Sequence, residues 1–188
     1  MTNHVTTRCT VRGSSADVAA FRALMVEEPR PASAPAAGIM AWLRGLMGRT
    51  APAPSTAPAH ATLDFNRILP MPDTLADGPE QAAWALEHWG TQRNADAYEE
   101  TARDDDAGGG ASLEFFLATA WSFPAPVFEA LHRRFPALHI DVVGFEEAWH
   151  FAVEGAYGPG ETGAVEVEPT AALYTRVHGV PPEPDEEG

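Results

Sequence analysis

The chain has 188 residues, a formal net charge of −15 and one cysteine, Cys9. This length, with 45% hydrophobic residues, predicts one domain around one core and excludes two packed enzyme domains. One cysteine excludes an internal disulfide and cannot supply the roughly four ligands of an iron–sulfur cluster. We therefore expect a cytoplasmic protein with no cofactor, no bound metal and no membrane span.

The first part of the chain predicts two strands and two helices. Residues 4–12 alternate between polar and apolar side chains, which is the period of a half-buried strand. A helix is expected to follow, with Ser15 as its N-cap. A second strand is predicted at 61–69, and a helix at 79–88 that ends at Gly90.

An insertion rich in proline and alanine, residues 28–60, separates these elements. Inside it, residues 39–49 have the spacing of a short amphipathic helix. Its apolar face is expected to pack on its own domain, in the groove of a partner or on a membrane surface. The residues of this candidate partner helix are Trp42, Leu43, Leu46 and Met47.

The second part of the chain begins with an acidic, glycine-rich stretch, residues 91–111, which predicts a mobile loop. A helix is expected to begin near Pro124 and to stop at Pro136. An acidic tail, 181–188, is predicted to be disordered. Strands are predicted at 113–119, 138–143, 149–157, 164–168 and 173–177.

The order of these elements predicts an α+β fold with a ferredoxin-like split βαβ core over residues 1–160. An antiparallel sheet would carry helices on one face, with an extra C-terminal hairpin, helical insertions and a C-terminal extension at 161–180. The other face would be open and polar. Strand parity places on it His4, Arg8, Arg12, Asp64, Asn66, Glu114, Phe116, His139 and Asp141.

Several short segments together resemble the YubB-type ferredoxin-like family of phage and conjugative-plasmid proteins. The resemblance implies this fold and a mobile-element setting, but it implies no established reaction and no catalytic residues. The chain departs from the family in its marked insertion around Trp42 and in Arg93, where an aromatic residue is expected. The matching segments are Asn3-His4-Val5-Thr6, 65–72, Trp89-Gly90 with Asn94, 119–127, Glu146-Glu147-Ala148-Trp149 and Tyr157.

Five residues of these segments are expected to converge at the strand ends as a candidate binding cluster. A tryptophan beside a short polar side chain is also common in cores where side chains satisfy loop backbone, so both interpretations stay open. The five are Asn66, Arg67, Trp89, Asn94 and Trp121.

A metal site on the open face would need His139, Asp141 and Glu154, with His139 opposite Glu154 if four residues form the hairpin turn. Their spacing is not diagnostic of any metal, so none is predicted. RNA recognition would need aromatic stacking positions on the central strands. The central strands offer only His4 and Phe116 for stacking, and the net charge is −15, so nucleic acid is not expected as a partner.

The charge distribution is the strongest indication of function in the sequence. Residues 96–188 hold 19 acidic and 4 basic side chains, whereas residues 1–95 hold 8 of each. The predicted acidic surface comprises Glu99, Glu100, Asp104, Asp105, Asp106, Glu146 and Glu147. Such a surface steers association with a basic partner.

The leading hypothesis is therefore a mobile-element accessory protein that binds a basic host or element-encoded protein, as a nucleic-acid mimic or a host-defence modulator. The first alternative is an enzyme or metal-dependent activity on the open face, and the second is a nucleic-acid-binding module. No catalytic residue is assigned.

Overall fold

Strand β1 (His4–Ser14) lies inside a six-stranded antiparallel sheet. Its side chains alternate between buried and partly exposed, as predicted. The computed structural model describes residues 3–27 and 61–183. The strand order is β4-β5-β1-β6-β7-β8. The other five strands are β4 (Ala97–Asp105), β5 (Gly110–Ala120), β6 (His139–Glu146), β7 (Ala152–Tyr157) and β8 (Gly163–Val167).

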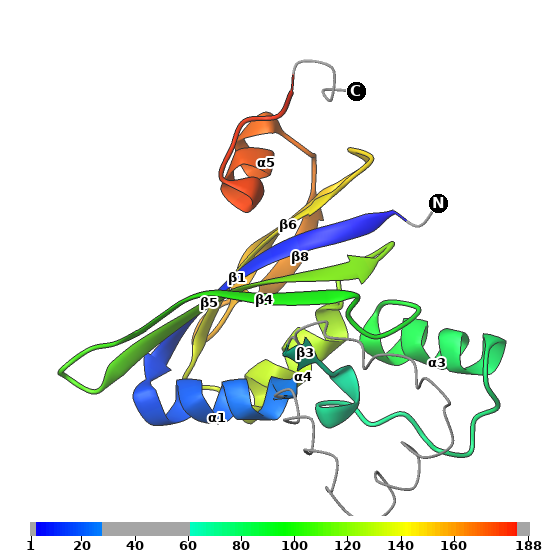
Figure 1. Cartoon of the computed structure of the whole chain (residues 1–188), viewed down its shortest axis with the longest axis horizontal. Helices are drawn as coiled ribbons and strands as arrows, with labels where there is room; N and C mark the ends of the chain where they lie inside the picture. Colours follow the sequence, from blue (N-terminus) through cyan, green and yellow to red (C-terminus); the bar gives the residue numbers. More distant parts are fainter. Residues whose placement is uncertain (1–2, 28–60, 184–188) are drawn as a thin grey trace, which may run out of the picture.

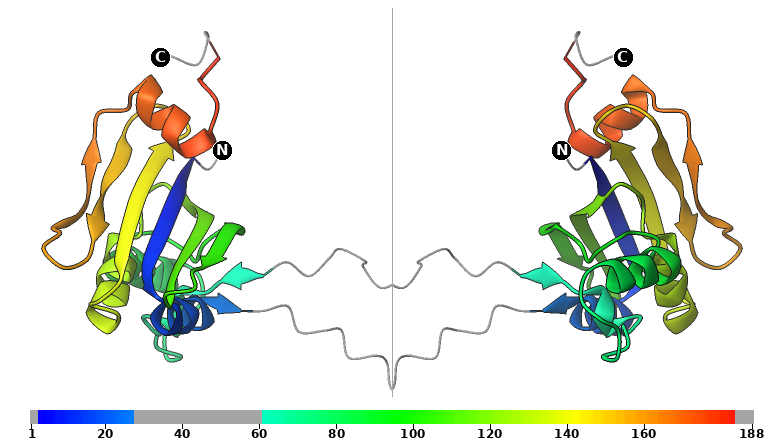
Figure 2. Two further views of the ribbon diagram at one scale, coloured as in Figure 1. Left: turned by 90° about the vertical axis from the view of Figure 1, so that its left-hand side faces the viewer. Right: turned by 90° about the vertical axis from the view of Figure 1, so that its right-hand side faces the viewer.

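Helices cover both faces of this sheet, but unequally (Figure 1). Helices α1 (Ser15–Met25) and α4 (Ala125–Arg134) bury their apolar sides in the main core, and α3 (Pro79–Trp89) packs beside α4. Helix α5 (Ala171–His178) lies on the opposite face, against β6 and β1. Figure 2 shows α5 at the end of the sheet where the chain starts.

The α+β class is confirmed. In the sequence, α1 lies between β1 and β4, and α4 lies between β5 and β6, while the spatial order is β4-β5-β1-β6. This arrangement is consistent with the predicted ferredoxin-like core. Strands β7 and β8 then extend the sheet as a C-terminal hairpin, as expected.

The strand predicted at 61–69 is wrong. Only β3 (Thr62–Leu63) is extended, and it pairs with β2 (Val26–Glu27) in a separate two-stranded sheet. A 3₁₀ helix, η1 (Phe65–Arg67), follows at once. The cause is Asp64, whose Oδ1 accepts a hydrogen bond from the backbone N–H of Asn66 at 3.0 Å and so caps this helical turn.

The loop predicted at 91–111 is also wrong over its middle part, because Ala97–Asp105 form the edge strand β4. Two of its side chains point towards the helices and attach the strand to the core. Tyr98 packs on Phe115 with 5.5 Å between ring centroids, and Glu100 accepts a hydrogen bond from Arg22 of α1 at 2.5 Å. Residues 91–96 and a tight turn at 106–109 are what remains of the predicted loop.

Two smaller corrections concern helices. The N-cap of α1 is Ser14, whose Oγ accepts a hydrogen bond from the N–H of Asp17 at 3.1 Å, and not Ser15. Residues 173–177 belong to helix α5 and are not a strand, because Thr170 caps the start of this helix.

The predicted helix at 39–49, with Trp42, Leu43, Leu46 and Met47, lies outside the described residues. Within the described ranges, no helix is long and apolar enough to cross a membrane.

Candidate functional site

The sheet face opposite α1 and α4 is divided into an apolar half and a polar half. Near the start of β1, α5 covers the sheet, and Phe145 and Val143 pack against Leu173 and Val177 of the helix. Further along the same strands the face stays open, and Thr10 lies beside Asp141. The open face predicted from strand parity therefore exists, but only over part of the sheet.

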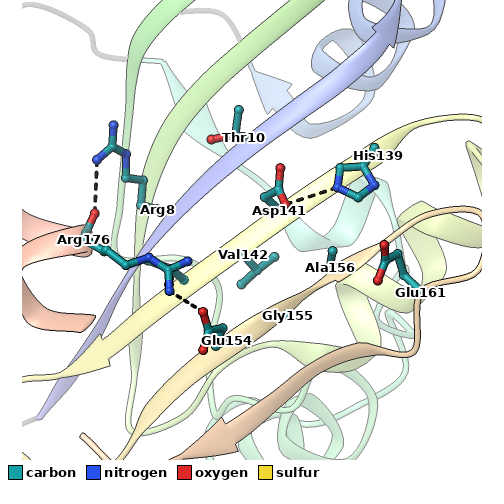
Figure 3. Close-up of a pocket in the computed structure, with 11 residues that line it drawn as sticks. Arg8, Thr10, His139, Asp141, Val142, Glu154, Gly155, Ala156, Glu161 and Arg176 are labelled. Atoms are coloured by element: carbon teal, nitrogen blue, oxygen red, sulfur yellow. Dashed lines mark hydrogen bonds and ion pairs between the residues drawn. The ribbon is translucent and has the colours of Figure 1, made fainter. Parts of the chain in front are cut away.

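A row of ion pairs marks the boundary between the two halves. The guanidinium of Arg8 donates hydrogen bonds to both carboxylate oxygens of Glu114, at 2.9 and 3.0 Å, and a third to the carbonyl of Arg176 at 3.1 Å. Arg176 in turn forms an ion pair with Glu154 (Figure 3). Arg8 and Glu114, which strand parity places on the same face, are thus in direct contact.

Beside this row the polar half contains a hollow of about 510 Å³. Within it, Nε2 of His139 lies 3.2 Å from Oδ1 of Asp141 (Figure 3). Asp141 also pairs with Arg12. Each partly exposed pair contributes about 0–1 kcal/mol to stability. The side chains that line the hollow include Arg8, Thr10, His139, Asp141, Glu154, Glu161 and Arg176.

The predicted hairpin register that would have joined three metal ligands is wrong. Glu154 pairs with Val143, not with His139, because β6 continues to Glu146 before the chain turns. Among the residues that the structure describes, no group of three His, Cys, Asp or Glu side chains is placed to hold a metal ion. Asp64 and Asn66, also expected on this face, lie outside the six-stranded sheet.

Three residues of the candidate binding cluster organise the loop at 64–71. Oδ1 of Asn94 accepts a hydrogen bond from the N–H of Phe65 at 2.9 Å. Nε1 of Trp89 donates to the carbonyl of Leu69 at 2.8 Å, and Oδ1 of Asn66 accepts from the N–H of Met71 at 3.1 Å. These contacts favour a loop-stabilising role.

The remaining two members of the cluster differ from each other. Arg67 donates to the carbonyls of Ala23 and Val26, both at 2.8 Å, and thereby caps the end of α1. Trp121 stands apart on the turn after β5, with 45% of its surface exposed and a positive φ of 70°. Asn66 and Arg67 are exposed as well, but Trp121 is the member that presents a large apolar side chain to a partner.

The predicted acidic surface is divided by the structure. Glu99, Asp104 and Asp105 are exposed on the edge strand β4, and among the described residues none of the three forms an ion pair. Asp106 is exposed at the adjoining turn, where its carboxylate accepts hydrogen bonds from backbone N–H groups. Glu100 is held by Arg22.

The last two acidic residues lie at the turn after β6. Glu147 is exposed, whereas Glu146 is 2% exposed and therefore does not belong to the surface. The carboxylate of Glu146 instead accepts hydrogen bonds from the backbone N–H groups of Ala148 and His150, each at 3.1 Å. The predicted strand ended at residue 143, so Glu146 was not assigned to the core-facing side that it shares with Ile140 and Val142.

Helix α5 contributes site residues that the sequence interpretation missed, namely Arg176 in the large hollow and Tyr174 on the apolar half. Their positions follow from the helix, which was predicted as a strand. The helix signals were present in the sequence, since Thr170 precedes the element and Gly179 ends it in a left-handed conformation.

Asp96 offers a test of the contacts at the start of β1. Arg93 donates hydrogen bonds to both carboxylate oxygens of Asp96, at 2.7 and 2.9 Å. These bonds lower the pKa of the Asp96 carboxyl. Burial opposes this lowering, and His4, 3.3 Å away, adds to it. A carboxyl whose pKa is lowered in the folded state stabilises the protein at pH values above its ordinary pKa of about 3.9. This contribution disappears as the pH falls through the pKa of the folded state.

We therefore expect Asp96→Asn to lower the free energy of unfolding at pH 7 and to have little effect in strong acid. Urea denaturation of both proteins across the acidic range measures this. A constant difference at every pH would contradict the assigned ion pair.

The fold and the geometry together define an acidic α+β protein with a charged edge strand and a polar, partly covered sheet face. No family model, no curated protein and no solved structure matches the chain. Its function must therefore be argued from the described residues.

Proposed function

We propose that this chain is a protein-binding module and that the exposed acidic edge of β4 binds a basic partner protein. The observation that carries the proposal is the set of exposed carboxylates of Glu99, Asp104 and Asp105, which find no cation among the described residues. Carboxylates that are not neutralised within their own chain leave a negative potential, which attracts and orients a positively charged surface.

Charged side chains on an edge strand also have a simpler role, because they prevent the edge from pairing with other strands. One or two such charges would be enough for that purpose. Here the charged strand continues into a turn where Asp106 adds a further carboxylate. Arg103 is the single basic residue of the strand. This concentration of one sign of charge favours a recognition surface.

The biological setting within the proposal is a phage or conjugative plasmid, where the module would act as an accessory protein on a basic host or element-encoded protein. It could do so by imitating nucleic acid or by modulating a host defence. This part rests on the resemblance to the YubB-type family and not on any contact in the fold.

An affinity capture from host lysate tests the proposal. Tagged full-length protein is used as bait, with and without nuclease, beside a variant with Glu99→Gln, Asp104→Asn and Asp105→Asn. We expect mass spectrometry to recover a basic protein in both nuclease conditions with the natural chain and to recover much less with the variant. Equal recovery by both baits would contradict the role of β4.

A second candidate function is the binding of a small polar molecule in the large hollow. Its volume of about 510 Å³ lies within the usual range for small-molecule sites, roughly 300–1,000 Å³. Its lining combines two arginines, Arg8 and Arg176, with the carboxylates of Asp141 and Glu154, and Arg176 is paired with Glu154 (Figure 3). Such a lining suits a ligand that carries both charges.

This candidate predicts that protein incubated with host metabolites and then desalted retains a small molecule. The retained compound should be lost from an Asp141→Asn variant. Retention by neither protein, or equal retention by both, would contradict a ligand site in this hollow.

A further inference from the structure

A second, smaller hollow lies where α5 crosses the sheet near the start of β1. Its volume is about 220 Å³, below the roughly 300–1,000 Å³ of sites that enclose a whole small molecule, and it suits the end of one side chain. It is lined by Thr6, Phe145, Glu147, Trp149, Tyr174 and His178. Phe145, Trp149 and Tyr174 also belong to the apolar cluster that packs α5 on the sheet.

The aromatic walls have a defined geometry. The rings of Trp149 and Tyr174 are nearly parallel, with 5.6 Å between centroids and 13° between planes. Phe145 meets both edge-on, at 4.7 Å from Trp149 and 5.3 Å from Tyr174, and His178 lies 4.3 Å from Tyr174. Aromatic faces carry partial negative charge and attract cations within about 6 Å.

A carboxylate stands among these rings. The side chain of Glu147 is 54% exposed, and its Oε1 lies 3.7 Å from Nδ1 of His4. The backbone N–H of Glu147 donates to the carbonyl of His4 at 3.0 Å, which attaches the turn to β1. Aromatic rings combined with one carboxylate match an organic cation, since the rings take its flat or apolar part and Glu147 takes its charge.

The turn that carries Trp149 and Glu147 is held rigidly. Trp149 has a positive φ of 60°, which is unusual for a bulky residue and persists only where the surroundings fix it. Its two neighbours, Ala148 and His150, donate their N–H groups to the buried carboxylate of Glu146, and its own N–H donates to the Glu146 carbonyl at 3.1 Å. The hollow is thus organised before any ligand arrives.

We propose that this hollow binds the guanidinium group of an arginine side chain on the basic partner. The inference rests on the proposed function, because it names the anchor of the same interaction. Arginine fits better than lysine, since its planar group stacks on Trp149 or Tyr174 while its N–H groups pair with Glu147 in a two-pronged contact. A lysine ammonium is more strongly hydrated and offers no plane to stack.

The test follows the indole N–H signals of the five tryptophans by NMR while the ¹⁵N-labelled full chain is titrated with N-acetyl-arginine methylamide. We expect a saturable shift of the Trp149 signal, identified with Trp149→Phe, that exceeds the shifts of the other four. The lysine analogue should bind at least about threefold more weakly.

Glu147→Gln should weaken binding of the arginine derivative by about fivefold or more, because a charge-assisted contact is lost. Glu129→Gln, an exposed substitution on α4 with the same change in charge, should leave it unaltered. If the Trp149 signal does not move, or moves equally in Glu147→Gln, the assignment of this hollow is overturned.

The same samples separate this inference from the proposed function. If an arginine-rich peptide shifts the backbone signals of Glu99 and Asp104 but not the Trp149 indole, the hollow is excluded and the acidic edge stands. If the arginine derivative shifts Trp149 but the triple variant of β4 binds the peptide as the natural chain does, the hollow stands and the acidic edge is excluded.

Discussion

Replacement of Phe145 by alanine is expected to lower the free energy of unfolding by about 3–5 kcal/mol. Phe145 is 1% exposed, and its ring packs edge-on against both Trp149 and Tyr174. The substitution would leave a cavity between the sheet and α5, at the place where Leu173 of the helix is anchored. Urea denaturation followed by circular dichroism measures the change.

Phe116→Ala provides a matched control on the same sheet face. Phe116 is only partly buried, and the guanidinium of Arg8 lies 5.8 Å from its ring centroid. We expect a smaller loss of about 1–2 kcal/mol in the free energy of unfolding, because folding buries less of the apolar surface of Phe116. If Phe145→Ala were no more destabilising than Phe116→Ala, α5 would not be packed on the sheet as described.

Neutralising the acidic edge is expected to weaken binding of a basic partner at least about tenfold at low ionic strength. The variant carries Glu99→Gln, Asp104→Asn and Asp105→Asn. Each exposed carboxylate is worth about 0.5 kcal/mol to an electrostatic contact, so the three together amount to about a factor of ten. Isothermal titration calorimetry with an arginine-rich peptide measures the affinity.

The matched control removes the same number of charges elsewhere, with Asp73→Asn, Glu166→Gln and Glu168→Gln. All three positions are exposed and lie off the β4 edge. Both variants have the same net charge, so a difference between them reports the position of the carboxylates. Equal loss of affinity in the two variants would mean that total charge, and not β4, governs binding.

Much of the sheet could be predicted because its strands carry strong local signals. The alternation in β1 follows directly from burial of one face. The register of β1 against its neighbour β5 places Arg8 within reach of Glu114 on β5. Strand β4 was missed because its sequence is acidic and borders on glycines. It pairs with β5 along its length, and Glu100 adds a contact to Arg22 of α1, which is distant in sequence.

The candidate sites were less predictable than the fold. The aromatic hollow joins the turn after β6 to α5, so it depends on a tertiary contact between Trp149 and Tyr174 that no local pattern encodes. Glu146 was assigned to the surface because it lies in an acidic run, whereas backbone N–H groups bind its carboxylate inside the turn. The triple of exposed acids on β4, by contrast, was expected from composition alone.

The salt dependence of binding tests the central claim most directly. Affinities of the natural chain, the β4 variant and the matched control for the arginine-rich peptide are measured from low to high ionic strength. The account predicts that the natural chain and the control lose affinity steeply as salt screens the exposed carboxylates, while the β4 variant starts weaker and changes less. Three parallel curves with equal affinities would contradict recognition by the acidic edge.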